Sequence, residues 1–125
     1  MRLPDHIRIA VIEQLRPLSP KAVYLFGSYG TARQHPASDL DLAVLPATSL
    51  DPVSRFQLAN HLSTLLGIEV DLLDLSTSST VMAKEVLRTG ERLIADDLTA
   101  AREFEMRTLA DYARLNEERR PILAR

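Results

Sequence analysis

Two aspartates, Asp39 and Asp41, stand two positions apart at the start of an apolar segment that ends at Leu45. Residues at this spacing point to the same face of a strand, with Cα atoms about 6.5 Å apart. Carboxylates held so close repel each other unless a cation lies between them, and Mg²⁺ prefers hard oxygen ligands. Aspartate is also depleted in strands. The pair therefore indicates a divalent-metal site, with a solvated strand mouth carrying ordinary surface acids as the open alternative.

A second feature is the pair Gly27-Ser28, which directly follows the apolar segment of residues 22–26. A glycine at the end of a buried strand permits a tight turn and lets a ligand approach the main chain. If a helical turn follows, its free N–H groups and the Ser28 hydroxyl converge on a spot that suits a phosphate. Taken alone, the common pair Gly-Ser is better explained as a turn in which Ser28 caps a short helix.

A third carboxylate comes from the segment that contains Asp71 and Asp74. Positions an odd number apart face opposite sides of a strand, so only one of the two can join Asp39 and Asp41. Asp71 lies near the start of its strand, and we expect it to complete the site, with Asp74 as a strand-end or capping residue. Such a set could hold two Mg²⁺ ions that bridge a nucleoside triphosphate and align a hydroxyl with its α-phosphate.

Hydrophobic periodicity and chain breakers predict the elements that would position these residues. Strands and helices alternate along the chain, which predicts an α+β (α/β-like) fold in which helices cover a small mixed sheet. The expected strands are residues 21–26, 40–45, 68–75 and 92–95, and the expected helices are residues 5–16, 52–66, a segment between the Ser/Thr cluster 76–80 and Gly90, and about 98–118.

Length and composition exclude several classes of function. A chain of 125 residues supports a single domain, residues 1–125. A net charge of −2 and an aromatic content of 5% disfavour direct nucleic-acid binding. The absence of cysteine excludes thiolate catalysis and suits a reducing cytoplasm. No apolar run resembles a signal peptide or a membrane span, so we expect a cytoplasmic protein that does not bind membranes.

The last expected helix carries two apolar stripes, although a surface helix of a small domain needs only one. Two interpretations stay open: the helix packs on its own domain and also on a partner, or one wide stripe fills a single groove. The first stripe contains Ala101, Phe104, Tyr112 and Leu115, and the second contains Met106, Leu109, Ala110 and Ala113.

Three basic residues have roles that the sequence leaves open. Arg33 lies between the Gly-Ser pair and the aspartates, and Lys84 and Arg88 lie one helical turn apart in a later helix. Each could face the phosphates of a nucleotide, but a solvated loop charge for Arg33 and an exposed basic stripe for Lys84 and Arg88 are the more common explanations.

Gly27-Ser28, ten intervening residues and Asp39-Leu40-Asp41 match the signature of the DNA polymerase β-like nucleotidyltransferases. The short length resembles the minimal nucleotidyltransferase (MNT) branch of that superfamily. Beyond the signature, the chain is similar to the MntA-type antitoxins of HEPN/MNT toxin–antitoxin pairs. The similar segments are Tyr24–Tyr29, Ser38–Leu45, Val70–Leu75 and Ser79–Val81.

The resemblance implies the nucleotidyltransferase fold and a protein adenylyltransferase in a type VII-like toxin–antitoxin pair. Such antitoxins transfer AMP from ATP to a tyrosine of the partner HEPN ribonuclease and so silence it. Carried over by position, Gly27 and Ser28 would bind the triphosphate, and Asp39, Asp41 and Asp71 would be the metal-binding and catalytic carboxylates. The implied cofactor is Mg²⁺, two per active site, and the implied partner is a HEPN toxin held in a hetero-oligomer.

Two other functions stay open at this stage. Transfer to a small-molecule hydroxyl would resemble the aminoglycoside nucleotidyltransferases, but those proteins carry an additional substrate-binding region. A non-catalytic module could block its toxin by contact alone, although the complete set of three acids argues against lost catalysis.

Overall fold

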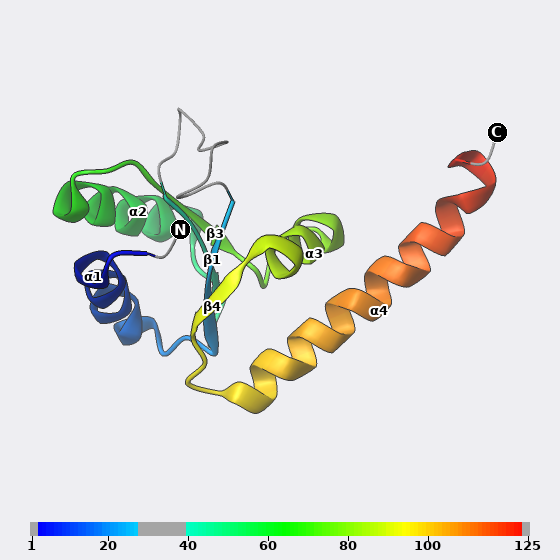
Figure 1. Cartoon of the computed structure of the whole chain (residues 1–125), viewed down its shortest axis with the longest axis horizontal. Helices are drawn as coiled ribbons and strands as arrows, with labels where there is room; N and C mark the ends of the chain where they lie inside the picture. Colours follow the sequence, from blue (N-terminus) through cyan, green and yellow to red (C-terminus); the bar gives the residue numbers. More distant parts are fainter. Residues whose placement is uncertain (1–2, 28–39, 124–125) are drawn as a thin grey trace.

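The predicted elements are all present in the structure, a computed structural model that describes residues 3–27 and 40–123 (Figure 1). The fold is α+β, as expected. Strand and helix limits lie within about two residues of the predicted ones, except at the end of the last helix. The elements are α1 (Asp5–Leu15), a short 3-10 turn η1 (Arg16–Leu18), β1 (Ala22–Phe26), β2 (Leu40–Leu45), α2 (Pro52–Leu66), β3 (Val70–Asp74), α3 (Thr80–Thr89), β4 (Glu91–Ile94) and α4 (Leu98–Leu123).

The four strands form one mixed sheet in the order β3-β2-β1-β4. β1 is antiparallel to both of its neighbours, β2 and β4. β2 and β3 are parallel, and a parallel pair needs a crossover connection. Helix α2 supplies that crossover. The end of β1 and the starts of β2 and β3 therefore meet at the same edge of the sheet.

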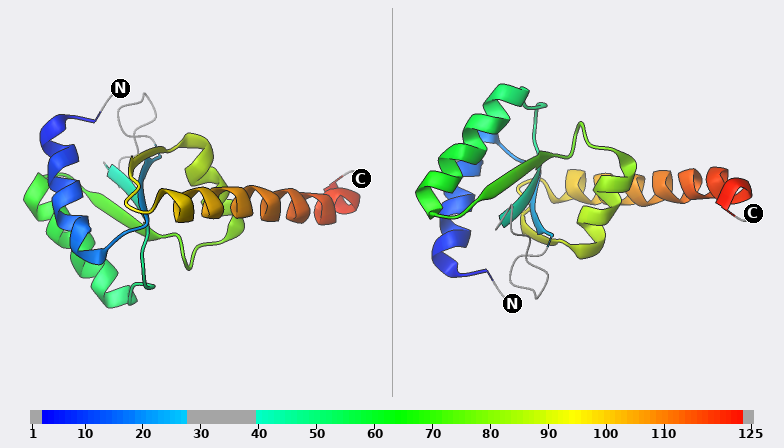
Figure 2. Two further views of the ribbon diagram at one scale, coloured as in Figure 1. Left: turned by 90° about the horizontal axis from the view of Figure 1, so that it is seen from below. Right: turned by 90° about the horizontal axis from the view of Figure 1, so that it is seen from above.

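Each face of the sheet is covered by two helices (Figure 2). Leu40, Leu42 and Val44 of β2 belong to the hydrophobic core beneath α1 and α2. Ala43 and Leu45, at the alternate positions, belong to a second core beneath α3 and α4. The alternation of side chains along a strand thus divides the interior into two layers.

Local capping signals fix the ends of the two central helices. The Asp51 side chain caps α2 by accepting a hydrogen bond from the Ser54 N–H at 3.1 Å, and Gly67 ends that helix with a φ of +70°. Ser79 caps α3 by accepting from the Met82 N–H at 3.1 Å. Aspartate and serine are preferred N-cap residues, and glycine is the preferred residue at the C-terminal end of a helix.

One apolar stripe of α4 packs against the protein, and the other is largely exposed. Ala101 is buried, and Phe104 packs against the core beneath α3 and α4; Thr108 is also buried. Met106 and Leu109 of the second stripe are 72% and 53% exposed. The two stripes therefore do not fill one groove.

The C-terminal part of α4 projects beyond the rest of the molecule (Figures 1 and 2). The helix continues past the expected end at residue 118, through Pro121 to Leu123. Its packing against α3 extends to Tyr112, whose ring lies 4.8 Å from the Lys84 Nζ. Within the described ranges, no helix has both the length and the apolar character that crossing a membrane requires.

Candidate active site

The candidate site lies where the end of β1 meets the starts of β2 and β3. In the strand register Asp41 pairs with Phe26 of β1 on one side and with Asp71 of β3 on the other. Paired residues of neighbouring strands face the same side of a sheet, and adjacent strands lie about 4.8 Å apart. Asp41 and Asp71 therefore share the sheet face that α3 and α4 cover.

Gly27 adjoins Asp41 and has no room for a side chain. Its φ is +78°, a conformation that side chains disfavour. A Cβ atom at this position would overlap the Asp41 Oδ2 and would lie 3.1 Å from the Asp41 Cγ. The glycine therefore lets the main chain approach the carboxylate closely, as the sequence predicts for the turn after a buried strand.

The structure gives Asp71 and Asp74 different surroundings. Asp71 is exposed, whereas Asp74 is 3% exposed. One Asp74 oxygen accepts from the Leu50 N–H at 2.8 Å, and the other accepts from the N–H and the hydroxyl of Ser76 at 2.8 and 2.6 Å. Asp74 thus ties together the segments that follow β2 and β3, which fits the strand-end role predicted for it.

The two paired carboxylates form an electrostatically unfavourable arrangement by themselves. Like charges directly opposite each other on neighbouring strands destabilise a sheet. Asp41 is half-buried, which strengthens the effect. Carboxylate oxygens are the ligands that Mg²⁺ prefers, so the pair fits a divalent cation. Residues 3–27 and 40–123 contain no group of three or more His, Asp or Glu side chains arranged to hold a metal.

The remaining predicted residues divide into two groups. Ser28, Arg33 and Asp39 lie outside the described residues. On α3, Lys84 is half-buried and Arg88 is exposed, and Arg88 forms an ion pair with Glu85.

Sequence reasoning missed a polar network between the sheet and α4. The Tyr24 hydroxyl donates to the Glu105 Oε2 at 2.7 Å, and the Arg92 guanidinium donates to the same oxygen at 2.8 Å. Burial, together with the hydrogen bond to Glu105, raises the pKa of Tyr24 well above its usual range, so its hydroxyl stays protonated. The available signal was a tyrosine on the inner face of a buried strand, since a buried hydroxyl needs a partner.

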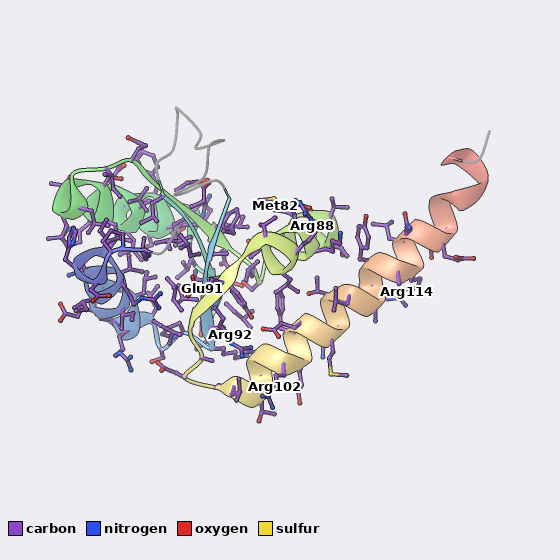
Figure 3. All side chains as sticks on the ribbon, in the orientation of Figure 1. Met82, Arg88, Glu91, Arg92, Arg102 and Arg114 are labelled. Atoms are coloured by element: carbon purple, nitrogen blue, oxygen red, sulfur yellow. The ribbon has the colours of Figure 1, made fainter. Side chains whose placement is uncertain are left out.

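Above this network, α3 and α4 enclose a pocket of about 460 Å³. It lies on the same sheet face as Asp41, over β1 and β4. Two of its basic residues, Arg88 of α3 and Arg92 of β4, are labelled in Figure 3. Its lining consists of Tyr24, Lys84, Leu87, Arg88, Gly90, Arg92, Glu105 and Leu109.

The sequence matches a known family over most of its length. Residues 10–99 match the family described as Polymerase beta, Nucleotidyltransferase. The chain is 40% identical over 119 residues to the protein adenylyltransferase MntA of Shewanella oneidensis, covering 90% of this chain and 82% of that protein.

Solved structures of the same family are similar to this chain in fold. One is a chain in the structure of a tri-AMPylated Shewanella oneidensis HEPN toxin in complex with an MNT antitoxin. The TM-score is 0.81 and the sequence identity is 34%, and the match covers 96% of this chain and 95% of that chain. This chain is also similar to a chain in a toxin–antitoxin structure with AMP-PNP, with a TM-score of 0.81, 38% identity, and coverage of 94% and 95%.

Proposed function

Because this chain belongs to the polymerase beta nucleotidyltransferase family, and within it to the family of MntA, we propose that it is a protein adenylyltransferase that acts as an antitoxin. It transfers AMP from ATP to a tyrosine hydroxyl of a partner HEPN ribonuclease and thereby neutralises that toxin. The similar proteins that carry this activity or bind AMP-PNP match almost the whole of this chain. We expect the reaction to take place in the cytoplasm, where ATP is available.

The observation that carries the proposal is the position of Asp41, which lies against Gly27 and opposite Asp71 at one edge of the sheet. The main chain at Gly27, where no side chain blocks close approach, therefore lies beside two carboxylates. A phosphate ester can bind to main-chain N–H groups at such a turn. The neighbouring carboxylates supply the ligands for cations that accompany a triphosphate.

We assign roles to five residues. Gly27 and Ser28 bind the triphosphate, and Asp39 and Asp41 hold the metal. Asp71 accepts the proton of the tyrosine hydroxyl or completes the metal shell. When bound, Mg²⁺, proposed as two ions per site, neutralises the phosphate charge and lowers the barrier to nucleophilic attack.

The reaction exchanges a phosphoanhydride bond of ATP for a phosphoester bond to the tyrosine. The tyrosine oxygen forms a bond to the α-phosphorus, and the bond from that phosphorus to the β-phosphate bridging oxygen breaks. Pyrophosphate leaves with the electron pair, and the hydroxyl proton passes to a base such as the Asp71 carboxylate. The role of the protein is to hold the hydroxyl in line with the departing group, because orientation supplies much of the barrier reduction.

The test is to mix the purified protein with ATP, Mg²⁺ and the HEPN protein encoded beside it, and to measure the intact mass of the latter. A gain of one or more AMP units supports the proposal. Tight binding without a mass gain would instead identify a non-catalytic module, and AMP found only on a small-molecule hydroxyl would identify the other alternative.

Asp41→Asn is the first variant to compare in this assay. We expect transfer to fall at least about a hundredfold, as for removal of one group that stabilises transition-state charge. The fold should persist, because the change removes repulsion with Asp71 and opens no cavity. Asp96→Asn, an exposed carboxylate beyond the far end of β4, is the control and should leave transfer unchanged. An Asp41→Asn variant with normal transfer would contradict the assignment.

A further inference from the structure

The solvent side of α2 carries no charged side chain. The structure describes every residue of this helix, Pro52–Leu66, and none of its exposed positions is Asp, Glu, Lys or Arg. The one residue of these types in the helix, Arg55, is half-buried and donates from its Nη1 to the main-chain oxygen of Leu72 at 2.8 Å. Charged and polar side chains normally occupy the exposed face of a surface helix, and 26% of the whole chain is charged. The exposed face of α2 is therefore unusual for one that stays in water.

Two large apolar side chains project from the same face. Val53 and Phe56 are 61% and 64% exposed. Depletion of charge together with an exposed aromatic ring is typical of the centre of a protein–protein interface. Figure 2 shows α2 on the side of the molecule away from α4, so this face is separate from the second apolar stripe of α4 and from the pocket.

The most exposed line of α2 has a spacing that reads the same in both directions. Its members are separated by four, three and four residues, which places them in one row along the helix. They are Val53, Gln57, Asn60 and Thr64, and all four are exposed. Rows with this spacing form the seam between paired helices. Because the row is symmetric about its midpoint, it matches a second copy of itself that runs antiparallel.

A twofold contact between two such rows brings only neutral groups together. In a C2 interface, residue i meets residue j of the second copy and j meets i. With the axis at the midpoint of the row, Gln57 meets Asn60 of the second copy, and Val53 meets the methyl group of Thr64. Side-chain amides both donate and accept hydrogen bonds, so Gln57 and Asn60 can pair without a charge. Phe56 flanks the row and extends the apolar contact to one side of the seam.

We propose that α2 is a self-association surface through which two copies of this chain form a symmetric, antiparallel helix pair. The antiparallel arrangement sets the positive end of each helix dipole beside the negative end of the other, and a net charge of −2 per chain adds little repulsion. A helix of 15 residues is about 22 Å long. The contact is therefore at the small end of interface areas and gives a weak dimer. Helix α4 stays accessible in both copies.

The experiment places one cysteine in each of two variants, Val53→Cys and Thr64→Cys, of the full-length chain, which has no cysteine of its own. In the antiparallel pair, position 53 of one copy lies beside position 64 of the other, within the roughly 7 Å that a disulfide spans between Cα atoms. Two copies of the same position are offset along the seam by the 11 residues that separate 53 from 64, which is about 16 Å. Oxidised glutathione should therefore produce disulfide dimers in an equimolar mixture and not in either variant alone.

Sedimentation velocity checks the same contact without cysteines. The weight-average sedimentation coefficient of the unmodified chain should rise between about 10 and 500 µM, where a weak dimer becomes populated. Gln57→Glu combined with Asn60→Glu sets like charges against each other at the seam and should weaken self-association at least about tenfold. Both positions are exposed, so the fold should persist. Met106→Glu combined with Ala110→Glu is the control, because it adds the same two charges to an exposed face of α4; it should self-associate like the wild type.

The outcomes identify what covers this face. Disulfide dimers that form only in the mixture, and self-association that is lost only in the α2 variant, support the inference. Equal disulfide formation in the single variants and in the mixture would mean random collision or a parallel pair and would overturn it. A sedimentation coefficient independent of concentration, or self-association lost only in the α4 variant, would overturn it as well. So would a chain that stays monomeric while bound toxin protects the two cysteines from alkylation, because the toxin would then occupy the face.

Discussion

At the scale of single residues, the candidate site depends on how closely the main chain approaches one carboxylate. Gly27 and Gly67 both have positive φ angles, of 78° and 70°. A side chain at Gly27 would overlap the Asp41 carboxylate, whereas the space around Gly67 is open. The two glycines thus share one backbone requirement and differ in what surrounds them.

This difference allows backbone strain to be measured separately from damage to the site. We expect Gly67→Ala to cost about 1–2 kcal/mol of folding free energy, because it places a side chain in the left-handed region, and Gly27→Ala to cost at least as much, because its Cβ must also displace the Asp41 side chain. Only Gly27→Ala should also lower AMP transfer, by at least about tenfold, since it displaces Asp41. Thermal unfolding and the mass assay check the two effects. Equal transfer by both variants would show that the contact with Asp41 has no catalytic consequence.

The two acids of β3 give a second prediction at this scale. Asp71→Asn should abolish most transfer and leave thermal stability nearly unchanged, because the side chain is exposed. Asp74→Asn should cost about 1–3 kcal/mol of stability, since an amide cannot accept all three hydrogen bonds of the buried carboxylate. Any loss of transfer by Asp74→Asn should follow the unfolded fraction. A larger specific loss from Asp74→Asn would reverse the two roles.

At the scale of elements, the strands were predictable because each is a short apolar segment between breakers. Ala22–Phe26 lies between Pro20 and Gly27, which leaves no room for a helix. It was also predictable that Asp71 and Asp74 face opposite sides of the sheet, because they are an odd number of residues apart on one strand. The end of α4 was not predictable, because a proline normally stops a helix, yet α4 continues past Pro121.

The α3–α4 pocket could not be predicted in the same way. Its lining comes from four elements, and their mutual packing is set by the tertiary structure. Tyr24 and Glu105 are 81 residues apart in the chain, and no local pattern links them. Lys84 and Arg88 could be placed on one helix face, but that face acquires its neighbour only when α4 packs beside it.

The outer stripe of α4 gives a prediction at this scale. Met106 is 72% exposed, and Ala110, one turn later, is also exposed. We propose that this face contacts the toxin, because a surface helix of a single domain needs only one apolar face. Met106→Glu combined with Ala110→Glu should weaken the complex at least about tenfold, by burying charge in an apolar contact. ATP binding should not change.

The control places the same two charges elsewhere. Asn60→Glu with Thr64→Glu has the same spacing on the exposed side of α2. Calorimetric titration of each double variant with toxin distinguishes the two surfaces. Unchanged affinity of the α4 variant, with the fold intact, would mean that this stripe does not bind the toxin.

At the scale of the whole molecule, the two faces of the sheet have different tasks. The core beneath α1 and α2 contains most of the fully buried leucines and valines. The face beneath α3 and α4 contains Asp41, the polar network and the pocket. Substitutions in the first core should therefore change stability far more than nucleotide selectivity, and this separation lets stabilised variants be made without altering the site.

The projecting helix α4 also determines how the free protein moves in solution. Its 26 residues span about 39 Å, whereas a compact chain of this length has a radius of gyration of about 14 Å. Small-angle X-ray scattering of the free protein should give a larger radius and an asymmetric distance distribution. A radius of about 14 Å would mean that the helix folds back. An elongated molecule tumbles anisotropically, so rotational diffusion can report, without any label, when the helix becomes docked on another protein.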